Sequence, residues 1–252
     1  MTANAYTVYQ DFAPAPAMPF RMDRHYLLYA ARGAMRLEAE GRSWSLPPAR
    51  AALIAAGHEV IVTIPQPLTA LSVLFTPDST PPLKSALTVF EISPLARELL
   101  TACREHSDPQ ATLPPRPMAL FTALAQEVWH LAETPSSAHM PAGKSAVVRK
   151  ALRLTQERLA DDPSLDVLAA DLAITPRTLA RHFASELGMS WRAALRRLRM
   201  IRAIEMLAED GTAVTEVALS CGYSSMSAFS AAFRDMTGQS PAEFRRSFRS
   251  AA

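Results

Sequence analysis

The sequence contains few of the residues that build disulfide frameworks or metal centres. Its 252 residues include only two cysteines, Cys103 and Cys221, which lie far apart in the chain. Two isolated cysteines do not form a disulfide framework or a cysteine-rich metal site, and their scarcity is typical of a reducing cytoplasm. Residues 20–75 contain only His25 and His58, with no His-X-His spacing. A metal centre, which would need about three His and a Glu from neighbouring strands, is therefore not expected there.

Long apolar runs are also missing. No stretch of about 18 consecutive apolar residues occurs, and the first residues, MTANAYTVYQDF, contain no charged leader and no apolar signal segment. We therefore expect a cytoplasmic protein without a membrane partner. Because 49% of the residues are hydrophobic, a chain of this length can bury two ordinary cores, and two domains are expected.

Positive charge is unevenly distributed along the chain. Residues 1–143 carry 10 Lys and Arg against 12 Asp and Glu, whereas residues 144–252 carry 16 against 12. Fourteen of these 16 are arginine, whose planar guanidinium suits phosphates and guanine edges. A GC-rich genome would also favour arginine over lysine, so the arginine content carries only part of the inference. A basic C-terminal half is what a polyanion-binding protein needs.

Two copies of one motif flank a basic segment, residues 191–207, that has apolar residues at helical spacing and arginines between them. On each side, over residues 168–190 and 217–240, the pattern predicts a short helix, a tight turn and a longer helix. The copies match with an offset of 49 residues before the turn and 50 after it, as Ala169 with Ala218 and Phe183 with Phe233 show. Two helix-turn-helix units on a rigid spacer predict a DNA-binding protein.

The first third of the chain has a different pattern. Residues 1–19, rich in Pro and Ala, are predicted to be irregular. Short β-like runs bounded by turn signals follow at residues 25–33, 34–41, 42–46, 51–57, 59–64 and 68–75. Five or six strands at this spacing favour a small antiparallel barrel or sandwich.

Two helices are predicted after the strands, over residues 93–105 and 116–132. The second carries one apolar stripe, which would either pack on the strands or meet its counterpart in a second copy of the chain; both alternatives stay open. The stripe comprises Met118, Phe121, Leu124, Ala125, Val128 and Leu131. The predicted organisation is a β domain over residues 1–85, a helical connector and dimerisation segment over 86–132, a flexible linker over 133–144 and a DNA-binding domain over 145–252.

Four stretches make the reading of the C-terminal part specific: LAADLAITPRTLARHF, GMSWRAALRRLRMIRAIEML, VTEVALSCGYSSMSAFSAAFR and TGQSPAEFRR. Through them, residues 146–248 resemble the DNA-binding domain of the AraC/XylS family of transcription regulators. The N-terminal strands resemble, in fewer features, the cupin-like sensing domain common in that family. The resemblance implies an α+β protein with a cupin-like antiparallel β barrel, a helical connector and an all-α domain with two helix-turn-helix motifs.

The second helix of each helix-turn-helix unit is expected to lie in the major groove, with its exposed N-terminal residues at base edges. In the first unit, Arg177 and Arg181 lie one turn apart, and each can pair with a guanine; both match base-contacting positions of the family. Ala231 in the second unit stands where the family commonly carries a basic residue, so this unit is expected to read mainly shape and thymine methyl groups. A merely solvated helix face is the alternative. The predicted base contacts are Arg177, Thr178, Arg181, Met226, Ser227 and Ser230.

Contacts to the DNA backbone are predicted for arginines of the spacer and of the last helices, each of which could alternatively be only solvated. They are Arg196, Arg197, Arg199, Arg234, Arg245 and Arg246. Strand alternation selects residues that would line an effector pocket in the β domain, with an ordinary apolar core as the alternative. They are Tyr26, Leu28, Met35, Leu37, Trp44 and Ile54.

The sequence thus predicts a sequence-specific transcription regulator whose N-terminal domain senses an effector. No catalytic residue, metal or cofactor is assigned. The expected partners are double-stranded DNA, a small organic effector, RNA polymerase and a second copy of the chain. Two alternatives stay open: a regulator whose N-terminal domain only dimerises or binds a protein, and a cupin enzyme with a DNA-binding appendage.

Overall fold

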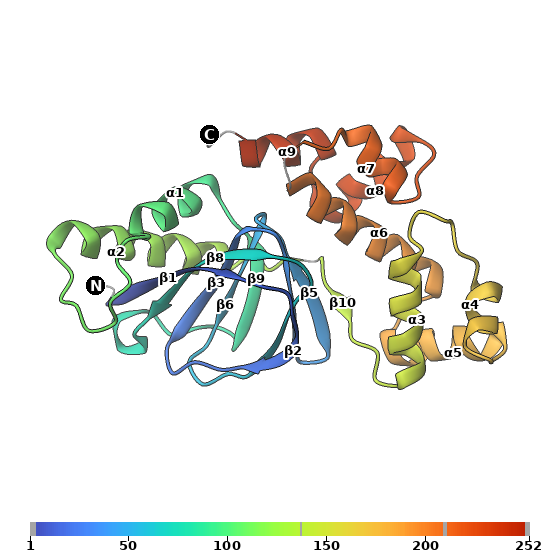
Figure 1. Cartoon of the computed structure of the whole chain (residues 1–252), viewed down its shortest axis with the longest axis horizontal. Helices are drawn as coiled ribbons and strands as arrows, with labels where there is room; N and C mark the ends of the chain where they lie inside the picture. The colour runs from blue at the N-terminus through green and yellow to red at the C-terminus, as the bar shows by residue number, and fades with distance from the viewer. Residues whose placement is uncertain (1–3, 137, 209–210, 250–252) are drawn as a thin grey trace. The chain divides into compact units, whose positions relative to one another are not determined.

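The chain folds into two compact units. The computed structural model describes residues 4–136, 138–208 and 211–249, with side chains described up to residue 246. Among the described residues, the first unit comprises residues 4–39 and 44–136, and the second comprises residues 40–43, 138–208 and 211–246. The first unit is rich in strands and the second is helical (Figure 1).

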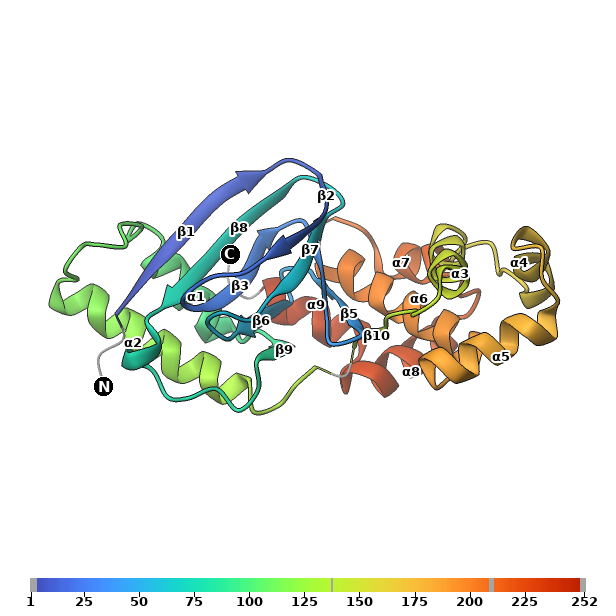
Figure 2. The same cartoon turned by 90° about the horizontal axis from the view of Figure 1, so that it is seen from below.

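All ten described strands lie in two five-stranded sheets with the orders β1-β8-β3-β6-β9 and β10-β5-β4-β7-β2. The described strands therefore form a sandwich of sheets, not the closed barrel expected from the sequence. Figure 2 shows β1 and β8 running side by side along one edge, with Ala5 opposite Phe75 and Phe12 opposite Leu68. The strands are β1 (Ala5–Phe12), β2 (Ala15–Phe20), β3 (His25–Arg32), β4 (Met35–Ala39), β5 (Arg42–Leu46), β6 (Arg50–Ile54), β7 (Val60–Ile64), β8 (Leu68–Phe75), β9 (Leu87–Glu91) and β10 (Met140–Pro141).

Alternate residues of β3 enter two different cores. Leu27 and Tyr29 belong to a cluster shared with helices α1 (Pro94–Cys103) and α2 (Pro115–Leu131). Tyr26 and Leu28 belong to a second cluster, which we call the inter-sheet layer because it also contains residues of β4, β5 and β7. Since β3 is buried on both faces, it reads as a continuous apolar run and not as an alternating one.

The apolar stripe of α2 packs inside the chain. Phe121, Leu124 and Val128 are fully buried against the sheet that contains β3. Ser93 caps α1 by accepting a hydrogen bond from Ala96 N at 3.1 Å, and its hydroxyl donates to Glu127 on α2 at 2.6 Å. Of the two alternatives for this stripe, packing within the chain is the one observed, so a dimer would need a different surface.

Three segments differ from the sequence prediction. Residues 5–12 and 15–20 form β1 and β2, so the prediction of an irregular segment over residues 1–19 was wrong. Their pairing partners lie 40 or more residues away along the chain, so a local sequence pattern cannot reveal them. Strand β9 lies within the predicted helical connector and is tied to β6 by an ion pair of Arg50 with Glu91 at 3.0 Å. Within the predicted flexible linker, β10 pairs with Arg42 and Ser43, and Met140 is buried in the core of the second unit.

The helices of the second unit follow the predicted positions to within about one turn. They are α3 (Ala146–Glu157), α4 (Leu165–Asp171), α5 (Pro176–Leu187), α6 (Trp191–Ala208), α7 (Val214–Ser220), α8 (Met226–Thr237) and α9 (Pro241–Arg249). Trp191 begins α6 and is buried, and its indole N–H donates to the Thr155 hydroxyl of α3 at 3.2 Å. Among the residues that the structure describes, no helix is both long enough and apolar enough to cross a membrane.

A buried hydroxyl ties the unexpected strand β1 to α1, and this tie can be tested. Thr7 is 1% exposed, and its hydroxyl donates to the Cys103 carbonyl at 2.9 Å. Replacing Thr7 by Val should lower the free energy of unfolding of the first unit by about 1 kcal/mol, because a buried carbonyl loses its donor. Chemical unfolding of the full chain measures this. Thr69→Val is the control, since its hydroxyl bonds Asp11 at the exposed edge; an equal loss in both variants would contradict the assignment.

Candidate nucleic-acid interface

The two helix-turn-helix units share one backbone geometry. In the first turn Ala173 has a φ of 54°, and in the second Gly222 has a φ of 74°. The N–H after each of these residues donates back to the carbonyl of Ala169 at 3.1 Å or of Ala218 at 2.9 Å. Equivalent residues of the two turns are 49 positions apart, as the sequence offset predicts.

The longer helices that follow also begin and end alike. Thr175 caps α5 and Ser225 caps α8, each accepting a hydrogen bond from an N–H three residues later. Both helices end at a glycine in the left-handed region, Gly188 with a φ of 67° and Gly238 with a φ of 75°. These pairs are 50 positions apart, so the additional residue of the second unit lies between Gly222 and its helix cap.

The exposed face of α5 carries two arginines. Arg177 and Arg181 lie one turn apart and are both exposed, while Leu179 and Phe183 are fully buried on the opposite face. Ala180 and Ala184 are exposed as well. Each lies three residues after one of the arginines, so the two alanines continue the same stripe. Sequence reasoning omitted these two alanines because they have no hydrogen-bonding side chain, although their spacing was the signal.

Two residues predicted to point outward from α5 make contacts at its sides. The hydroxyl of Thr178 lies 2.9 Å from that of the cap residue Thr175, and Thr178 is half-buried. His182 Nδ1 lies 3.3 Å from a carboxylate oxygen of Glu186, one turn further along. The exposed Arg177 and Arg181 are therefore better placed to contact a base than Thr178, which is half-buried and whose hydroxyl contacts Thr175.

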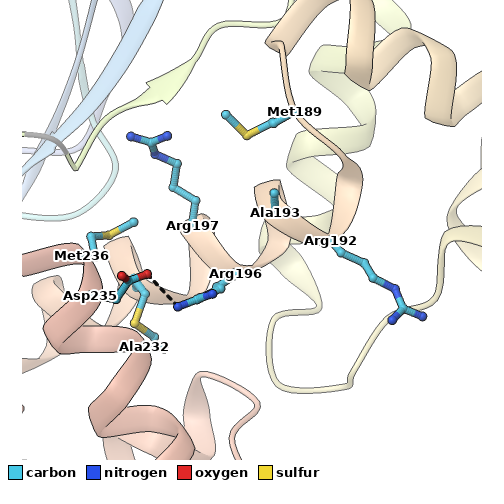
Figure 3. A pocket seen from close by; sticks show the side chains of 9 residues that line it. Met189, Arg192, Ala193, Arg196, Arg197, Ala232, Asp235 and Met236 are labelled. Carbon is cyan, nitrogen blue, oxygen red and sulfur yellow. Dashed lines mark hydrogen bonds and ion pairs between the residues drawn. The ribbon is translucent and has the colours of Figure 1, made fainter.

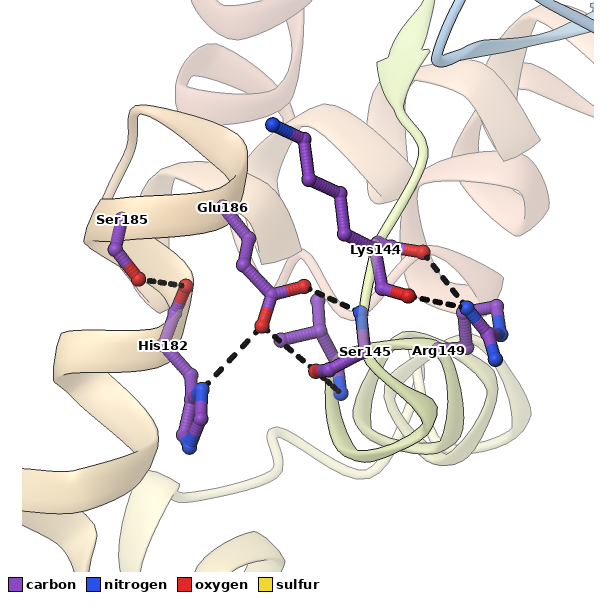
Figure 4. A network of polar contacts seen from close by, with 8 residues as sticks. Lys144, Ser145, Arg149, His182, Ser185 and Glu186 are labelled. Atoms are coloured by element: carbon purple, nitrogen blue, oxygen red, sulfur yellow. Dashed lines mark hydrogen bonds and ion pairs between the residues drawn. The ribbon is translucent and has the colours of Figure 1, made fainter.

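Glu186 joins α5 to the beginning of α3 (Figure 4). Its carboxylate accepts hydrogen bonds from the Ser145 N–H at 2.7 Å and from the Ser145 hydroxyl at 2.6 Å. The same Ser145 hydroxyl accepts from Val148 N and caps α3. Burial of the Glu186 carboxyl acts to raise its pKa, but the hydrogen bonds from Ser145 act in the opposite direction and leave the pKa below its ordinary value.

The exposed face of α8 is neutral at Ser227 and Ala231, the positions equivalent to Arg177 and Arg181 of α5. Met226 is 38% exposed, Ser227 is exposed, and Ser230 is half-buried. The Ser227 hydroxyl lies 2.8 Å from the hydroxyl of the cap residue Ser225. Ala231 is exposed and leaves the centre of this face without a polar side chain. The difference between the reading helices that the sequence suggested is therefore present in their exposed surfaces.

The arginines predicted to contact phosphate lie in different environments. Arg234 and Arg246 are exposed, and Arg196 is 55% exposed, with an ion pair to Asp235 of α8 at 2.8 Å. Arg197 and Arg245 are half-buried, and burial lowers the pKa of the Arg197 guanidinium because desolvation disfavours its charged form. The side chain of Arg199 is only 11% exposed.

Two grooves flank the N-terminal half of α6. The larger, of about 900 Å³, runs from Ala180 and Ala184 of α5 to Tyr223 in the second turn. The smaller, of about 570 Å³, lies between α6 and α8 and is shown in Figure 3, where Arg196 points to Asp235. Arg192 and Arg196 line both grooves. The larger groove therefore extends from Ala180 and Ala184, beside the arginines of α5, to the turn of the second helix-turn-helix unit.

The residues predicted to line an effector pocket all lie in the inter-sheet layer of the strand-rich unit. Tyr26, Leu28, Met35, Leu37, Trp44 and Ile54 are each at most 7% exposed. Strand alternation therefore selected residues that share one face. Within the described residues, no group of three or more His, Cys, Asp or Glu is arranged to hold a metal ion. Cys221 is buried, and burial raises its pKa to about 12, so its thiol stays protonated.

Comparison with known proteins matches residues 168–247 to a helix-turn-helix domain family. The HTH-type transcriptional regulator NimR of Escherichia coli is 28% identical over 221 residues, which cover 86% of this chain and 78% of NimR. Residues 168–247 are an AraC-type helix-turn-helix domain, and the chain is a transcription regulator. The HTH-type transcriptional activator RhaS of Escherichia fergusonii is 33% identical over 91 residues, which cover 36% of this chain and 33% of RhaS.

Among solved structures, the C-terminal domain of AraT, a response regulator from Geobacillus stearothermophilus, is similar with a TM-score of 0.38 and 34% identity, covering 40% of this chain and 85% of that domain. The AraC-family match accounts for both helix-turn-helix units and their spacer. The curated relatives are transcription regulators, and the chain is one as well and not an enzyme. The alternative of a cupin enzyme with a DNA-binding appendage is therefore set aside.

The Glu186 network gives this domain a predicted pH dependence. Because the folded-state pKa of Glu186 is lowered, its stabilisation is present above the ordinary Glu pKa of about 4.3 and is lost as the pH falls through the folded value. Glu186→Gln should reduce the free energy of unfolding by about 1–3 kcal/mol near neutral pH. The difference from wild type should shrink below about pH 4.

Chemical unfolding of the full chain across this range measures the effect. Glu157→Gln is the matched control, because Glu157 is 52% exposed and pairs only along its own helix with Arg153. A constant difference between Glu186→Gln and wild type down to the lowest pH would contradict the role of the Glu186 charge.

Proposed function

We propose that this AraC-type regulator reads a two-part operator, with α5 in one major groove and α8 in the next. The observation that carries the proposal is the exposed stripe of α5, where Arg177 and Arg181 present two guanidinium groups one turn apart. A guanidinium can donate two hydrogen bonds to O6 and N7 of a guanine. The neighbouring Ala180 and Ala184 leave room for the arginines to approach the base edges.

The second reading helix, in this proposal, contributes less hydrogen-bonded readout. Its exposed face offers Met226, Ser227, Ser230 and Ala231, which suit apolar contact with thymine methyl groups and single hydroxyl contacts. Shape and deformability of the DNA would supply the remaining specificity of this part of the operator. Operator preference should therefore be sharper under α5 than under α8.

The DNA backbone would follow the larger groove beside α6, between the two base-reading helices. Arg196 lines this groove, and the remaining predicted phosphate contacts lie on α6, α8 and α9. Besides Arg199, whose side chain is only 11% exposed, they are Arg197, Arg234, Arg245 and Arg246. Arg196 would exchange its exposed partner Asp235 for a phosphate, which costs little because an exposed ion pair is weak. Binding should weaken with salt, since each neutralised phosphate releases counterions.

For the strand-rich unit of the chain we infer an effector-sensing role. The inter-sheet layer combines Trp44, Tyr26 and Met35 with aliphatic residues, which suits a small apolar organic molecule. A layer that is simply a packed core is the competing reading, and the regulator would then act without an effector. The proposal also includes dimerisation through the strand-rich unit and contact with RNA polymerase. It places the protein in the cytoplasm, because the DNA that it binds lies there.

The division of labour between the reading helices is tested by Arg181→Ala and Ser230→Ala. Arg181→Ala should weaken binding to the selected operator by about 1–3 kcal/mol and relax the preference at one base-pair position. Ser230→Ala should cost at most about 0.5–1.5 kcal/mol, because it removes one neutral hydroxyl. The measurement is a titration against an operator selected from random DNA and against its single-base substitutions.

Arg197→Ala serves as the control for backbone contact. It should weaken selected and random DNA alike and lower the salt dependence by about one charge. All three variants should keep the wild-type melting temperature. A larger change in base preference for Ser230→Ala than for Arg181→Ala would show that the roles of the two helices are reversed.

If the strand-rich unit senses an effector, binding of that effector should stabilise this unit against unfolding. A molecule that binds only the folded state raises the free energy of unfolding by about 2.7 kcal/mol at a concentration 100 times its Kd, and the melting temperature rises with it. A thermal-shift screen of apolar carboxylates, aromatics and sugars on the full chain measures this. Trp44→Phe should reduce the shift, whereas Phe121→Leu in the other core should not. A folded protein without any shift would favour the effector-independent regulator.

A further inference from the structure

Arg199 of α6 contacts three parts of the DNA-binding unit at once. Its Nε–H donates to the Leu159 carbonyl at 3.2 Å, and a terminal nitrogen donates to Asp162 at 3.2 Å; both partners lie in the segment between α3 and α4. The guanidinium carbon lies 5.7 Å from the ring centroid of Tyr223, in the turn of the second helix-turn-helix unit. One side chain therefore joins the spacer helix α6, the segment that leads into the first helix-turn-helix unit and the turn of the second helix-turn-helix unit.

The burial of Arg199 sets it apart from the phosphate candidates. Its side chain is 11% exposed, whereas that of Arg196, one turn earlier on the same helix, is 55% exposed. A guanidinium is a planar fork whose donors can be used in fixed directions, which suits a group that bridges several elements. Arg199 also lines the larger groove, but its Nε and one terminal nitrogen already donate to Leu159 and Asp162, which leaves fewer donors for a DNA phosphate.

The neighbouring glycine shows how closely these parts approach one another. A Cβ on Gly222 would lie 2.4 Å from the Leu159 carbonyl oxygen and 2.5 Å from a terminal nitrogen of Arg199. The equivalent residue of the first turn, Ala173, carries a Cβ at a similarly positive φ of 54°. The positive φ alone thus does not demand glycine; contact with Arg199 and with the Leu159 carbonyl does.

We propose that Arg199 is a positioning residue that fixes the distance and rotation between the two reading helices, and thereby the operator spacing that the protein accepts. The inference rests on the proposed two-part operator. One added base pair moves one part of the operator by about 3.4 Å along the DNA and rotates it by about a tenth of a turn. Only a rigid link between the two units can discriminate against such a shift.

The experiment uses the full chain and an operator selected from random DNA, together with versions that have one base pair added or removed between the two parts. Wild type should bind the selected spacing about tenfold or more tightly, a loss similar to that of a mismatched base pair. Arg199→Lys, which keeps the charge but not the fork, and Arg199→Ala should each reduce this ratio by about fivefold or more. Base preference under α5 should persist, because Arg177 and Arg181 are unchanged.

Gly222→Ala supplies an independent variant with a matched control. It should push Arg199 away from the turn and relax the spacing preference in the same way. Gly238→Ala adds a Cβ at nearly the same φ, 75° against 74°, but meets no heavy atom within 4 Å, so it reports backbone strain alone. Arg202→Ala controls for lost charge on α6, since Arg202 pairs with Glu205 on its own helix.

Two outcomes would overturn the inference. If Arg199→Ala keeps the spacing preference but lowers the salt dependence by about one charge, Arg199 is a phosphate contact. If Arg199→Lys and Gly222→Ala both retain the wild-type spacing ratio, the link is not made by this side chain. Failure of the two-part operator itself looks different, because the wild-type protein would then show no spacing preference or no specific binding.

Discussion

The burial of α6 is the constraint on which the DNA-binding unit depends. Residues on several sides of this helix are buried, because one side packs against α3 and the first helix-turn-helix unit and another against the second. A helix buried on more than one side cannot turn about its axis without breaking both interfaces. The two reading helices are therefore carried by one rigid element, and their separation is a property of the fold. Arg199 adds a polar link to these apolar contacts.

Charge divides the labour between units that share one backbone. The caps, the left-handed turn residues and the terminal glycines recur in both units, so apart from one additional turn residue the difference between them lies in their side chains. Where α5 exposes Arg177 and Arg181, α8 exposes Met226, Ser227 and Ala231. The first can form paired hydrogen bonds with a base, and the second chiefly offers shape and apolar contact. A duplicated scaffold can thus hold the geometry constant while the chemistry of each half changes.

The strand-rich unit follows a different logic. Its central sheet is covered by α1 and α2 on one face and by the inter-sheet layer on the other. The helical cover uses the one apolar stripe that could have served a dimer, so any self-association must involve another surface. The inter-sheet layer remains the candidate effector region because it is the apolar interior that lies away from the helices.

Local sequence signals determined much of the helical unit. Caps such as Thr175 and Ser225, the C-terminal Gly188 and Gly238, and helical periodicity act within a few residues, so they identify α5, α6 and α8 without any tertiary information. Strands β1, β2 and β9 depend on partners far along the chain, and Pro and Ala in the first segment concealed the pairing. The roles of Thr178 and Arg199 were likewise beyond the sequence. Helical periodicity predicts on which face of a helix a side chain lies. Contacts with a neighbouring carbonyl, cap residue or aromatic ring decide whether that side chain can also contact DNA. Only the tertiary structure brings the Leu159 carbonyl and Tyr223 to Arg199, because the three belong to segments that meet only when the helices pack.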